Sequence, residues 1–579
     1  MRMFRIVTSA AVLKSMTKIS HYRLGHYAGL VATMLLTPVL WAEDCRSISG
    51  TVPDTADPFP ATWGIDVANT RFVPMARTSI NAENVHRLAL KWVYGYATNT
   101  PRSFPLVTSD TIFIGDNGTG LIALDRKTGC IRWRNTDTRD SVASSISFAS
   151  GPNGLELYFA NRQEGIFAVA ADTGRTLWQH TIDDEPVPFY SGSPMLVGER
   201  LFVPISSQEI ALSMNPFYGC CTTSGGMAAL DVRTGEKLWY LPTIAEPPQV
   251  IGRHYLFVEQ WGPSGAPVWS APTYDADNDL LLFGTGENYT EPATRTSDAI
   301  FAVDATSGKQ RWVVQFHTND TFNMGCVVDG PNCPENAGPD LDFGAPPVLA
   351  KTPSGRRLVF AGQKSGGVYA MDPLTGAEVW RTRIGRGGYL GGVHWGLAVD
   401  ESRGLLYVPI SDIPAGPLEP VSPAPGMHAV NLEDGTIRWS HHVDVSDLDG
   451  FWPGLSAGII ATQDLVVAGD LAGKVAAYSA DDGRILWEFD TAQTFAGTNG
   501  VAATGASIDA HGPLIVDDLL IVSSGYGGVG MQGGNALLVF QLTPEPHGEP
   551  DVNQVVEQAL HPKQINELES EQITGLSQE

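Results

Sequence analysis

The chain has 579 residues, of which 43% are hydrophobic and 17% are charged, with a formal net charge of −26 at pH 7. Length alone allows several domains. The acidic balance excludes a nucleic-acid-binding function, because such a surface repels phosphate backbones, and it favours basic partners; an acidic shell that only keeps the protein soluble is equally compatible.

The N-terminal residues have the pattern of a targeting segment. An apolar run of residues 28–42 follows five basic residues, which are Arg2, Arg5, Lys14, Lys18 and Arg23. The run includes Pro38 and, at about 15 residues, is too short for a membrane span. We therefore predict that residues 1–42 are a secretory signal peptide, with Met16 as an alternative start, and that the protein is periplasmic or secreted.

A repeated pattern then runs through the chain. The pattern is approximately A-x-D-x-x-T-G-x-x-x-W, and its copies end at Trp133, Trp178, Trp239, Trp312, Trp380, Trp439 and Trp487. Each copy predicts a strand, a tight turn and a second strand, because the glycine takes the positive φ that the turn requires. Seven such units at this spacing predict a β-propeller, and we expect the Trp residues to be structural wedges between blades.

The two ends of the repeat region complement each other. Residues 535–540 form a strand without a Trp hairpin after it, and residues 88–92 form a Trp-ending strand without a hairpin before it. Their pairing closes the ring and removes its free edges. We predict an all-β, eight-bladed propeller over residues 43–542, with seven blades as the alternative. Residues 543–579 are acidic and Pro-rich, so we expect a disordered or loosely packed tail.

Six cysteines remain after removal of residues 1–42, an even number for an exported chain, so we expect three disulfides. Cys326 and Cys333 are seven residues apart and are predicted to pair. Cys220 and Cys221 are adjacent; if bonded, they form a strained eight-membered ring, because neighbouring Cα atoms lie only about 3.8 Å apart. Cys45 and Cys130 then pair by elimination. The chain contains no C-x-x-C-H motif for covalent haem attachment.

Long inserts between the repeats hold the candidate functional residues. They include four oxygen-bearing side chains after inner strands of consecutive blades, which are Glu209, Glu287, Asn288 and Asp320. A single acid in a loop is usually only solvated, but a cluster of oxygen donors is what a hard cation such as Ca²⁺ requires. Trp269 also lies outside the repeat. It is either an ordinary core residue or a flat platform for an aromatic cofactor.

Several ordered motifs carry a family resemblance. They are WGID (63–66), NTR (69–71), SSQE (206–209), the vicinal cysteines, VWSAP (268–272), GTGENY (284–289), SDAI (297–300), DFGAPP (342–347), GQKSG (362–366) and GNALLVF (534–540). Over residues 60–540 the chain resembles the pyrroloquinoline quinone (PQQ) dependent alcohol dehydrogenases, which are eight-bladed periplasmic propellers. It is most similar to the polyvinyl alcohol dehydrogenase-like branch, although it has no cytochrome c domain.

The resemblance implies a role for individual residues. Trp269 stacks under PQQ, Lys364 bonds the quinone oxygens, and His394 and Trp395 lie beside the cofactor. Glu209 ligates Ca²⁺, together with either Glu287 or Asn288, and Asp320 contributes to the metal site and is the general base. The implied activity is oxidation of a primary or secondary alcohol, small or polymeric, to an aldehyde or ketone. Electrons then pass to a separate acceptor such as a basic cytochrome c.

The sequence also departs from the family pattern. Phe322 and Asn323 stand where many relatives have Trp and Asp, Ser224 stands where we expect Arg, and His394 replaces an amide-bearing residue. These changes weaken the expected contacts to the carboxylates of PQQ. Two alternatives therefore stay open: a non-catalytic propeller scaffold of the outer-membrane assembly type, and a propeller that has lost its cofactor. Trp269, Lys364 and the acidic residues favour the enzyme, because a scaffold does not need them.

Overall fold

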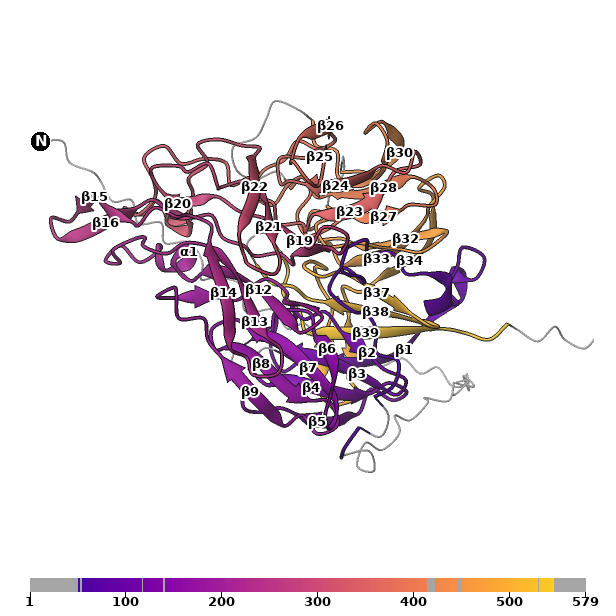
Figure 1. The fold of residues 1–579 in the computed structure, drawn as a ribbon. Coiled ribbons are helices and arrows are strands. Elements are labelled where there is room, and N and C mark those ends of the chain that lie inside the picture. Colours follow the sequence, from indigo (N-terminus) through magenta and orange to yellow (C-terminus); the bar gives the residue numbers. More distant parts are fainter. Residues whose placement is uncertain are drawn as a thin grey trace, which may run out of the picture. The chain divides into compact units, whose positions relative to one another are not determined.

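The computed structural model describes residues 50–545, apart from 53–54, 117, 139–140, 414–421, 446–449 and 529–530. The predicted signal peptide (1–42), Cys45 and nearly all of the predicted tail therefore lie outside the described residues. The described helices are short, and none of them reaches the length and hydrophobicity that a membrane span requires. The fold is described below for this part of the chain (Figure 1).

The described strands form eight antiparallel blades, as the repeat predicted. The first blade consists of β2 (Leu106–Val107), β3 (Thr111–Asp116), β4 (Gly120–Asp125) and β5 (Ile131–Arg134), and the second of β6 (Ser147–Gly151), β7 (Gly154–Asn161), β8 (Gly165–Ala170) and β9 (Thr176–His180). The third consists of β11 (Met195–Val197), β12 (Arg200–Ser207), β13 (Gly226–Asp231) and β14 (Lys237–Pro242), and β10 (Pro188–Phe189) also pairs with β12. The fourth consists of β18 (Thr273–Asp275), β19 (Leu280–Gly284), β21 (Ala299–Asp304) and β22 (Gln310–Gln315).

The remaining blades continue the pattern. The fifth blade consists of β23 (Val348–Lys351), β24 (Arg357–Gly362), β25 (Gly367–Met371) and β26 (Glu378–Arg383), and the sixth of β27 (Ala398–Asp400), β28 (Leu405–Ile410), β29 (Gly426–Asn431) and β30 (Ile437–His442). The seventh consists of β31 (Ile460–Ala461), β32 (Leu465–Gly469), β33 (Lys474–Ser479) and β34 (Ile485–Asp490). The eighth consists of β37 (Leu514–Val516), β38 (Leu519–Ser524), β39 (Ala536–Leu542) and β1 (Leu88–Gly95).

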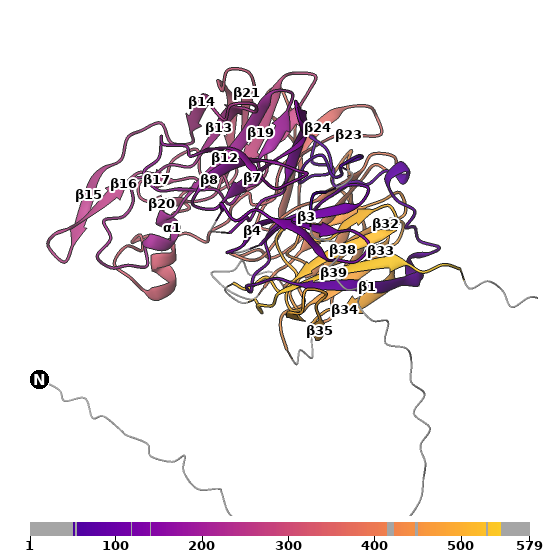
Figure 2. The ribbon, with the colours of Figure 1, turned by 90° about the horizontal axis from the view of Figure 1, so that it is seen from below.

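The eighth blade joins the two ends of the repeat region. Strand β1 pairs antiparallel with β39, and Leu90 lies opposite Phe540. Figure 2 shows the two strands side by side, β1 in indigo and β39 in yellow. The predicted closure by N- and C-terminal strands is therefore confirmed. Closure removes two free sheet edges, which would otherwise be open to pairing with other chains.

In six of the seven repeats, the Trp packs on the turn glycine of the next repeat. Trp133 donates its Nε1–H to the carbonyl of Ala171 (3.1 Å), and a Cβ on Gly174 would lie 2.4 Å from the Trp133 ring. Gly174 also has φ +71°, so both its turn and its close contact with the indole require glycine. The same contact recurs between Trp178 and Gly235. The repeat Trp residues are therefore wedges between blades.

Shorter elements decorate the ring. They are α1 (Glu209–Leu212), the 3₁₀ turns η2 (Met75–Arg77), η3 (Val85–Arg87) and η4 (Met324–Val328), and the two-stranded pairs β15 (Gln249–His254) with β16 (Val258–Gly262), β17 (Ser264–Gly265) with β20 (Asn288–Thr290), and β35 (Thr494–Ala496) with β36 (Ala502–Thr504). Figure 1 shows β15 and β16 extending away from the blades near α1. The inserts with α1, β20 and η4 carry much of the candidate site.

Candidate active site

Three buried carboxylates meet around one lysine. Glu287 precedes β20, whereas Asp340 and Asp342 lie in the irregular segment before β23, and oxygen atoms of all three lie within 4.8 Å of one another. Lys364, which follows β24, donates from Nζ to Asp340 Oδ1 (3.0 Å) and Asp342 Oδ2 (2.8 Å). We call Glu287, Asp340 and Asp342 the acid cluster.

Burial and mutual repulsion make the three acids of this cluster differ in pKa. Burial raises the pKa of Glu287 and Asp340 well above the usual range, and neighbouring carboxylates add to the effect. Burial also opposes ionisation of Asp342, but the Lys364 ammonium and the hydrogen bonds with Glu287 outweigh it and lower the Asp342 pKa to about 2. Protonation of Glu287 and Asp340 relieves the repulsion among the three acids, and a bound cation can take the place of those protons.

Four side chains that the sequence assigned to cofactor binding lie together beside the acid cluster. Trp269 donates its Nε1–H to Asp342 Oδ2 (3.1 Å), and Lys364 Nζ lies 5.3 Å from the centroid of the Trp269 ring. The Trp269 ring meets Trp395 and His394 edge to face, with centroid separations of 5.2 and 5.8 Å. These contacts build a continuous aromatic and cationic wall.

A cavity of about 450 Å³ opens onto this wall. Asp340, Lys364, His394, Trp395 and Tyr526 all line it. The Nε1 of Trp395 is buried without a hydrogen-bond partner, although a buried indole N–H normally has one. We call this space the aromatic cavity; its volume is within the ordinary range for small-molecule sites.

Arg102 contacts a residue that lines the aromatic cavity, and His394 lines the cavity itself. The Arg102 guanidinium lies 4.5 Å from the Tyr526 ring centroid, and its Nε has no partner. His394 bonds Ser456 Oγ through Nδ1 (2.7 Å), and burial lowers the His394 pKa to about 3, so the ring is neutral at neutral pH. The sequence analysis did not identify Arg102, because this residue lies in none of the motifs that carry the family resemblance. The Arg102 guanidinium packs on Tyr526, a lining residue, whereas Ser224 occupies the position where an Arg is expected.

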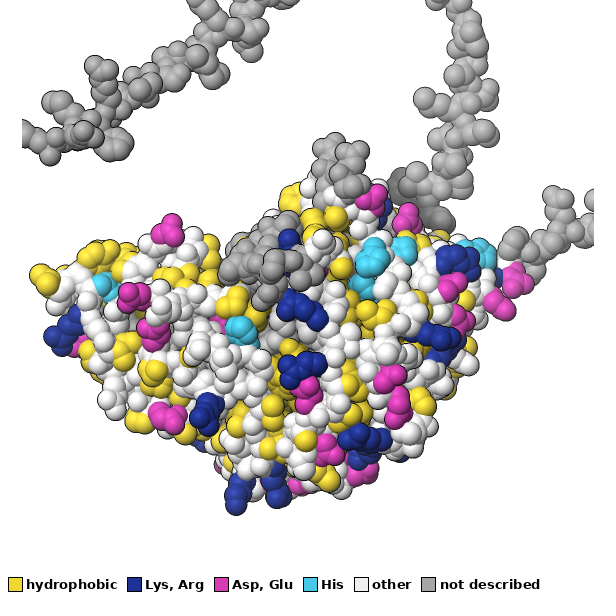
Figure 3. Space-filling view, turned by 90° about the horizontal axis from the view of Figure 1, so that it is seen from above, with side chains coloured by type: hydrophobic (Ala, Val, Ile, Leu, Met, Phe, Trp, Pro, Cys, Tyr) yellow, Lys and Arg dark blue, Asp and Glu magenta, His cyan; other side chains and the backbone are white. Residues whose placement is uncertain are grey.

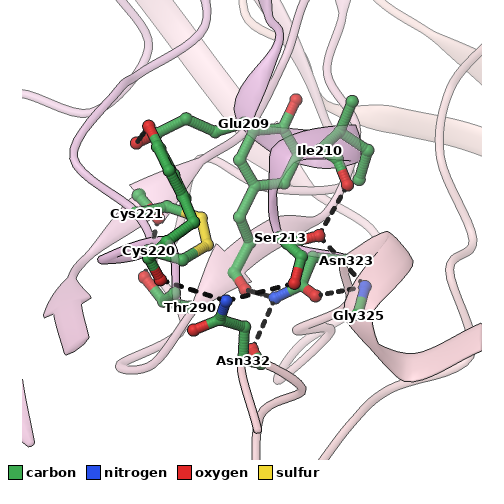
Figure 4. The surroundings of a disulfide bond; sticks show 12 residues. Glu209, Ile210, Ser213, Cys220, Cys221, Thr290, Asn323, Gly325 and Asn332 are labelled. Carbon is green, nitrogen blue, oxygen red and sulfur yellow. Dashed lines mark hydrogen bonds between the residues drawn. A yellow bond between two sulfur atoms is a disulfide. The ribbon is translucent and has the colours of Figure 1, made fainter. Parts of the chain in front are cut away.

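Glu209, a predicted Ca²⁺ ligand, is not a member of the acid cluster. It begins α1, and its carboxylate accepts hydrogen bonds from the backbone N–H groups of Thr222 (2.8 Å) and Thr223 (2.8 Å). The hydroxyls of Tyr218 (2.8 Å) and Thr223 (2.6 Å) complete the shell. Figure 4 shows Glu209 beside the vicinal cysteines. Neutral donors from its own insert thus satisfy this buried carboxylate.

Asn288 and Asp320 also have other contacts. The Asn288 side chain accepts from the Thr294 N–H (2.7 Å) and donates to the Ser264 carbonyl (3.0 Å). Asp320 is fully buried, and its carboxylate accepts the N–H groups of Asp340 (3.1 Å) and Leu341 (2.8 Å). Asp320 therefore holds the segment that carries the acid cluster. Of the four predicted oxygen donors, the structure places Glu287 in the cluster.

Sequence reasoning missed Asp340 and Asp342 as candidate ligands. Asp342 begins the DFGAPP motif and Asp340 stands two residues earlier, so the signal available was a pair of acids beside a motif already associated with the family. Their meeting with Glu287 depends on hydrogen bonds to residues distant in sequence, such as that from the Glu287 N–H to Asp342 Oδ1 (3.0 Å). The spacing of residues in the sequence does not predict such long-range hydrogen bonds.

Both disulfides whose cysteines are described agree with the prediction. Cys326 and Cys333 are bonded, with their Cα atoms 4.6 Å apart, and Cys220 is bonded to Cys221. The pairing predicted for Cys130 involves Cys45, outside the described residues.

Comparisons with known proteins identify the family of the chain. The chain is 35% identical to a polyvinylalcohol dehydrogenase of Pseudomonas sp over 83% of its length and 76% of that protein, and 31% identical to the enzyme of Sphingopyxis sp. (strain 113P3) over the same shares. A family model described as glucose/ethanol/alcohol dehydrogenase, beta-propeller domain, matches residues 193–386. The chain belongs to the PQQ-dependent alcohol dehydrogenase family.

Two other comparisons concern the fold of this family member. A family model described as outer membrane protein assembly factor BamB matches residues 80–252, 296–533 and 426–565. The crystal structure of quinohemoprotein alcohol dehydrogenase from Comamonas testosteroni superposes with a TM-score of 0.61 at 18% identity, over 86% of this chain and 82% of that one. Both matches follow the propeller repeat, which enzymes and scaffolds share.

Proposed function

We propose that this PQQ-dependent alcohol dehydrogenase binds PQQ in the aromatic cavity and Ca²⁺ at the acid cluster, and oxidises a small or polymeric alcohol. The observation that carries the proposal is the acid cluster with Lys364 at the edge of that cavity. The polymeric option rests on the two relatives named polyvinylalcohol dehydrogenase.

The donor set fits a hard cation. Glu287, Asp340 and Asp342 offer several carboxylate oxygens in one small volume, which suits Ca²⁺. Lys364 compensates one negative charge, and a cation compensates the rest. Since one related protein is named a lanthanide-dependent methanol dehydrogenase, trivalent ions belong in the same test.

The aromatic cavity fits a planar, carboxylated cofactor. Trp395 and His394 provide flat walls, Lys364 provides a positive charge, and the unpartnered N–H of Trp395 is a donor for a carboxylate. These donors compensate for the contacts that Ser224 and His394 are expected to weaken. When bound, PQQ supplies the two-electron oxidising group and Ca²⁺ the Lewis acid.

The chain's own residues provide proton transfer and orientation. Asp340 is the carboxylate of the cluster that lines the aromatic cavity, so it is the member of the cluster that faces a substrate bound there. We therefore assign Asp340 as the acceptor of the substrate hydroxyl proton. Lys364 and Trp269 fix Asp342 behind it. Asp320, the base assigned by resemblance, is the competing candidate.

Location and electron transfer complete the proposal. An exported chain with a net charge of −26 is suited to a periplasmic position and to a basic electron acceptor such as a separate cytochrome c. A scaffold role, the main alternative, would leave the acid cluster and the unpartnered cavity donors without a purpose.

Reconstitution tests the function directly. Apo protein is titrated with PQQ, with and without Ca²⁺, while tryptophan fluorescence and dye-linked oxidation of polyvinyl alcohol and of a small secondary alcohol are measured. We expect saturable quenching and activity only with both additions, and loss of activity when EDTA is present throughout. Absence of PQQ binding in every metal condition, including a lanthanide arm, would favour the scaffold.

A further inference from the structure

A second cavity lies next to the aromatic cavity and has a different character. Its volume is about 550 Å³, and it is bordered by the segments that follow β22, β24 and β26 together with residues 337–339 and Leu341. Gly338 and Pro339 border both cavities. Its polar lining includes His317, Gln363 and Ser365, and two guanidinium groups, Arg383 and Arg386. We call it the arginine cavity.

The lining of the arginine cavity is positively charged, whereas the protein as a whole has a net negative charge. The chain has 63 acidic and 37 basic residues, yet the lining contains two arginines, one histidine and no carboxylate. On the face shown in Figure 3, basic and acidic side chains are interspersed. Arg381, which lies on β26 and outside this cavity, is paired with an acidic residue: its Nε donates to Glu378 Oε1 (2.7 Å). A local cationic lining in an acidic protein favours an anionic ligand.

Arg383 and Arg386 have no carboxylate partner among the described residues. Arg383 instead donates to the carbonyls of Gly385 (3.2 Å) and Arg386 (2.7 Å). The nearby Asp412 carboxylate is bound by backbone N–H groups, including that of Arg386 (2.7 Å), and not by the Arg386 guanidinium. The positive charge of the Arg386 side chain is therefore not neutralised by the described protein groups.

Unpartnered donors in the lining point to a ligand independently of the charge. Gln363 is only 1% exposed; its Oε1 accepts from Ser365 Oγ (2.7 Å) and Tyr369 OH (3.3 Å), which leaves its Nε2 without a partner. The Nε and Nη2 atoms of Arg386 are also buried without a partner. Buried donors are nearly always paired with protein or ordered water, so these atoms are available to an acceptor that enters the cavity.

We propose that the arginine cavity binds a small oxyanion, a carboxylate or a phosphate. A guanidinium presents adjacent N–H groups in the fork geometry that two oxygens of one such anion match, and charge assistance strengthens both bonds. The Gln363 amide adds a neutral donor. The site does not depend on PQQ or on the acid cluster.

Calorimetric titration at low ionic strength tests the proposal. Sodium phosphate, acetate and succinate are titrated separately into apo protein, so that the arms distinguish phosphate from carboxylate. Arg386→Gln removes the unpaired guanidinium and should weaken binding of the preferred anion at least roughly tenfold. Arg381→Gln is the matched control, because it removes the same charge from the same blade outside the cavity; its affinity should stay within about twofold of wild type.

A second variant separates the ligand site from the fold. Gln363→Glu is nearly isosteric but places a carboxylate in the lining that also contains Arg386, so it should abolish anion binding, and circular dichroism checks that the variant stays folded. Three results would overturn the proposal: wild type that binds none of the three anions at millimolar concentration, equal weakening in Arg386→Gln and Arg381→Gln, or competition by PQQ, which would assign the cavity to the cofactor.

Discussion

Two groups of buried carboxylates in this protein are stabilised in opposite ways. Glu209 is surrounded by neutral donors, and the backbone of Thr222 and Thr223 turns its N–H groups toward it. The acid cluster has three carboxylates for one lysine, and burial raises the pKa of Glu287 and Asp340. By sequence alone, Glu209 and Glu287 were equivalent candidates for a metal ligand.

The difference shows what a buried acid requires. A carboxylate that accepts several N–H and O–H groups is stabilised without a counter-ion. Carboxylates that face one another need a cation, a proton or a lysine; in the acid cluster Lys364 binds Asp340 and Asp342, and the raised pKa of Glu287 and Asp340 favours protonation. A metal-site assignment should therefore depend on the charge balance around an acid more than on its presence in an insert.

The largest effect should come from the base inside the acid cluster. Asp340→Asn should lower kcat about 10²-fold or more, because the amide cannot take the substrate proton. Turnover of reconstituted enzyme, with PQQ content measured by absorbance, checks this. Asp320→Asn is the comparison: its amide oxygen can still accept from Leu341, so the loss should be smaller. The reverse order of the two losses would restore the assignment made by resemblance.

Cation affinity should separate the two carboxylate groups next. Glu287→Gln removes one of the three charges and should weaken Ca²⁺ binding roughly 10- to 100-fold, since ligand charge sets affinity at such sites. Calorimetric titration of apo protein measures it. Asn288→Ser, which alters the alternative ligand, should leave the affinity within a few-fold of wild type. A larger loss in Asn288→Ser would identify Asn288 as the ligand.

Glu209→Gln should affect stability more than cation binding. The new amide NH₂ faces donors that need an acceptor, which costs about 1–3 kcal/mol of unfolding free energy. Chemical denaturation measures this cost, and Ca²⁺ affinity of the same variant should be close to that of wild type. If Ca²⁺ binding instead falls as far as in Glu287→Gln, Glu209 reaches the metal after all.

The fold was predictable because its determinants are local. Each blade depends on a turn glycine and a Trp at fixed spacing, and contacts such as Trp133 with Gly174 repeat around the ring. The incomplete repeats at both ends then predicted the pairing of β1 with β39. Family membership was also predictable from ordered motifs, and it is confirmed by the two relatives above 30% identity.

The site was predictable only in part. Trp269, Lys364, His394 and Trp395 meet as the resemblance implied they should. Asp340 and Asp342 were missed because they lie in an irregular segment whose path is set by long-range bonds, including that from the Gly338 N–H to the Thr321 carbonyl (2.8 Å). The partners of Glu209 and Asn288 could not be read from spacing either, because a side chain's hydrogen bonds depend on how its loop folds back.

The smallest effect should come from the vicinal cysteines. Cys220 and Cys221 precede Thr222, whose N–H binds Glu209. They therefore belong to the insert that surrounds Glu209 with neutral donors, and not to the acid cluster (Figure 4). The ring that the disulfide closes is too small to restrict the unfolded chain much. Cys220→Ser/Cys221→Ser should therefore lower the melting temperature by only a few degrees and leave Ca²⁺ affinity and turnover near wild type. A marked loss of PQQ or Ca²⁺ affinity in this variant would show that the Glu209 insert and the acid cluster act as one site.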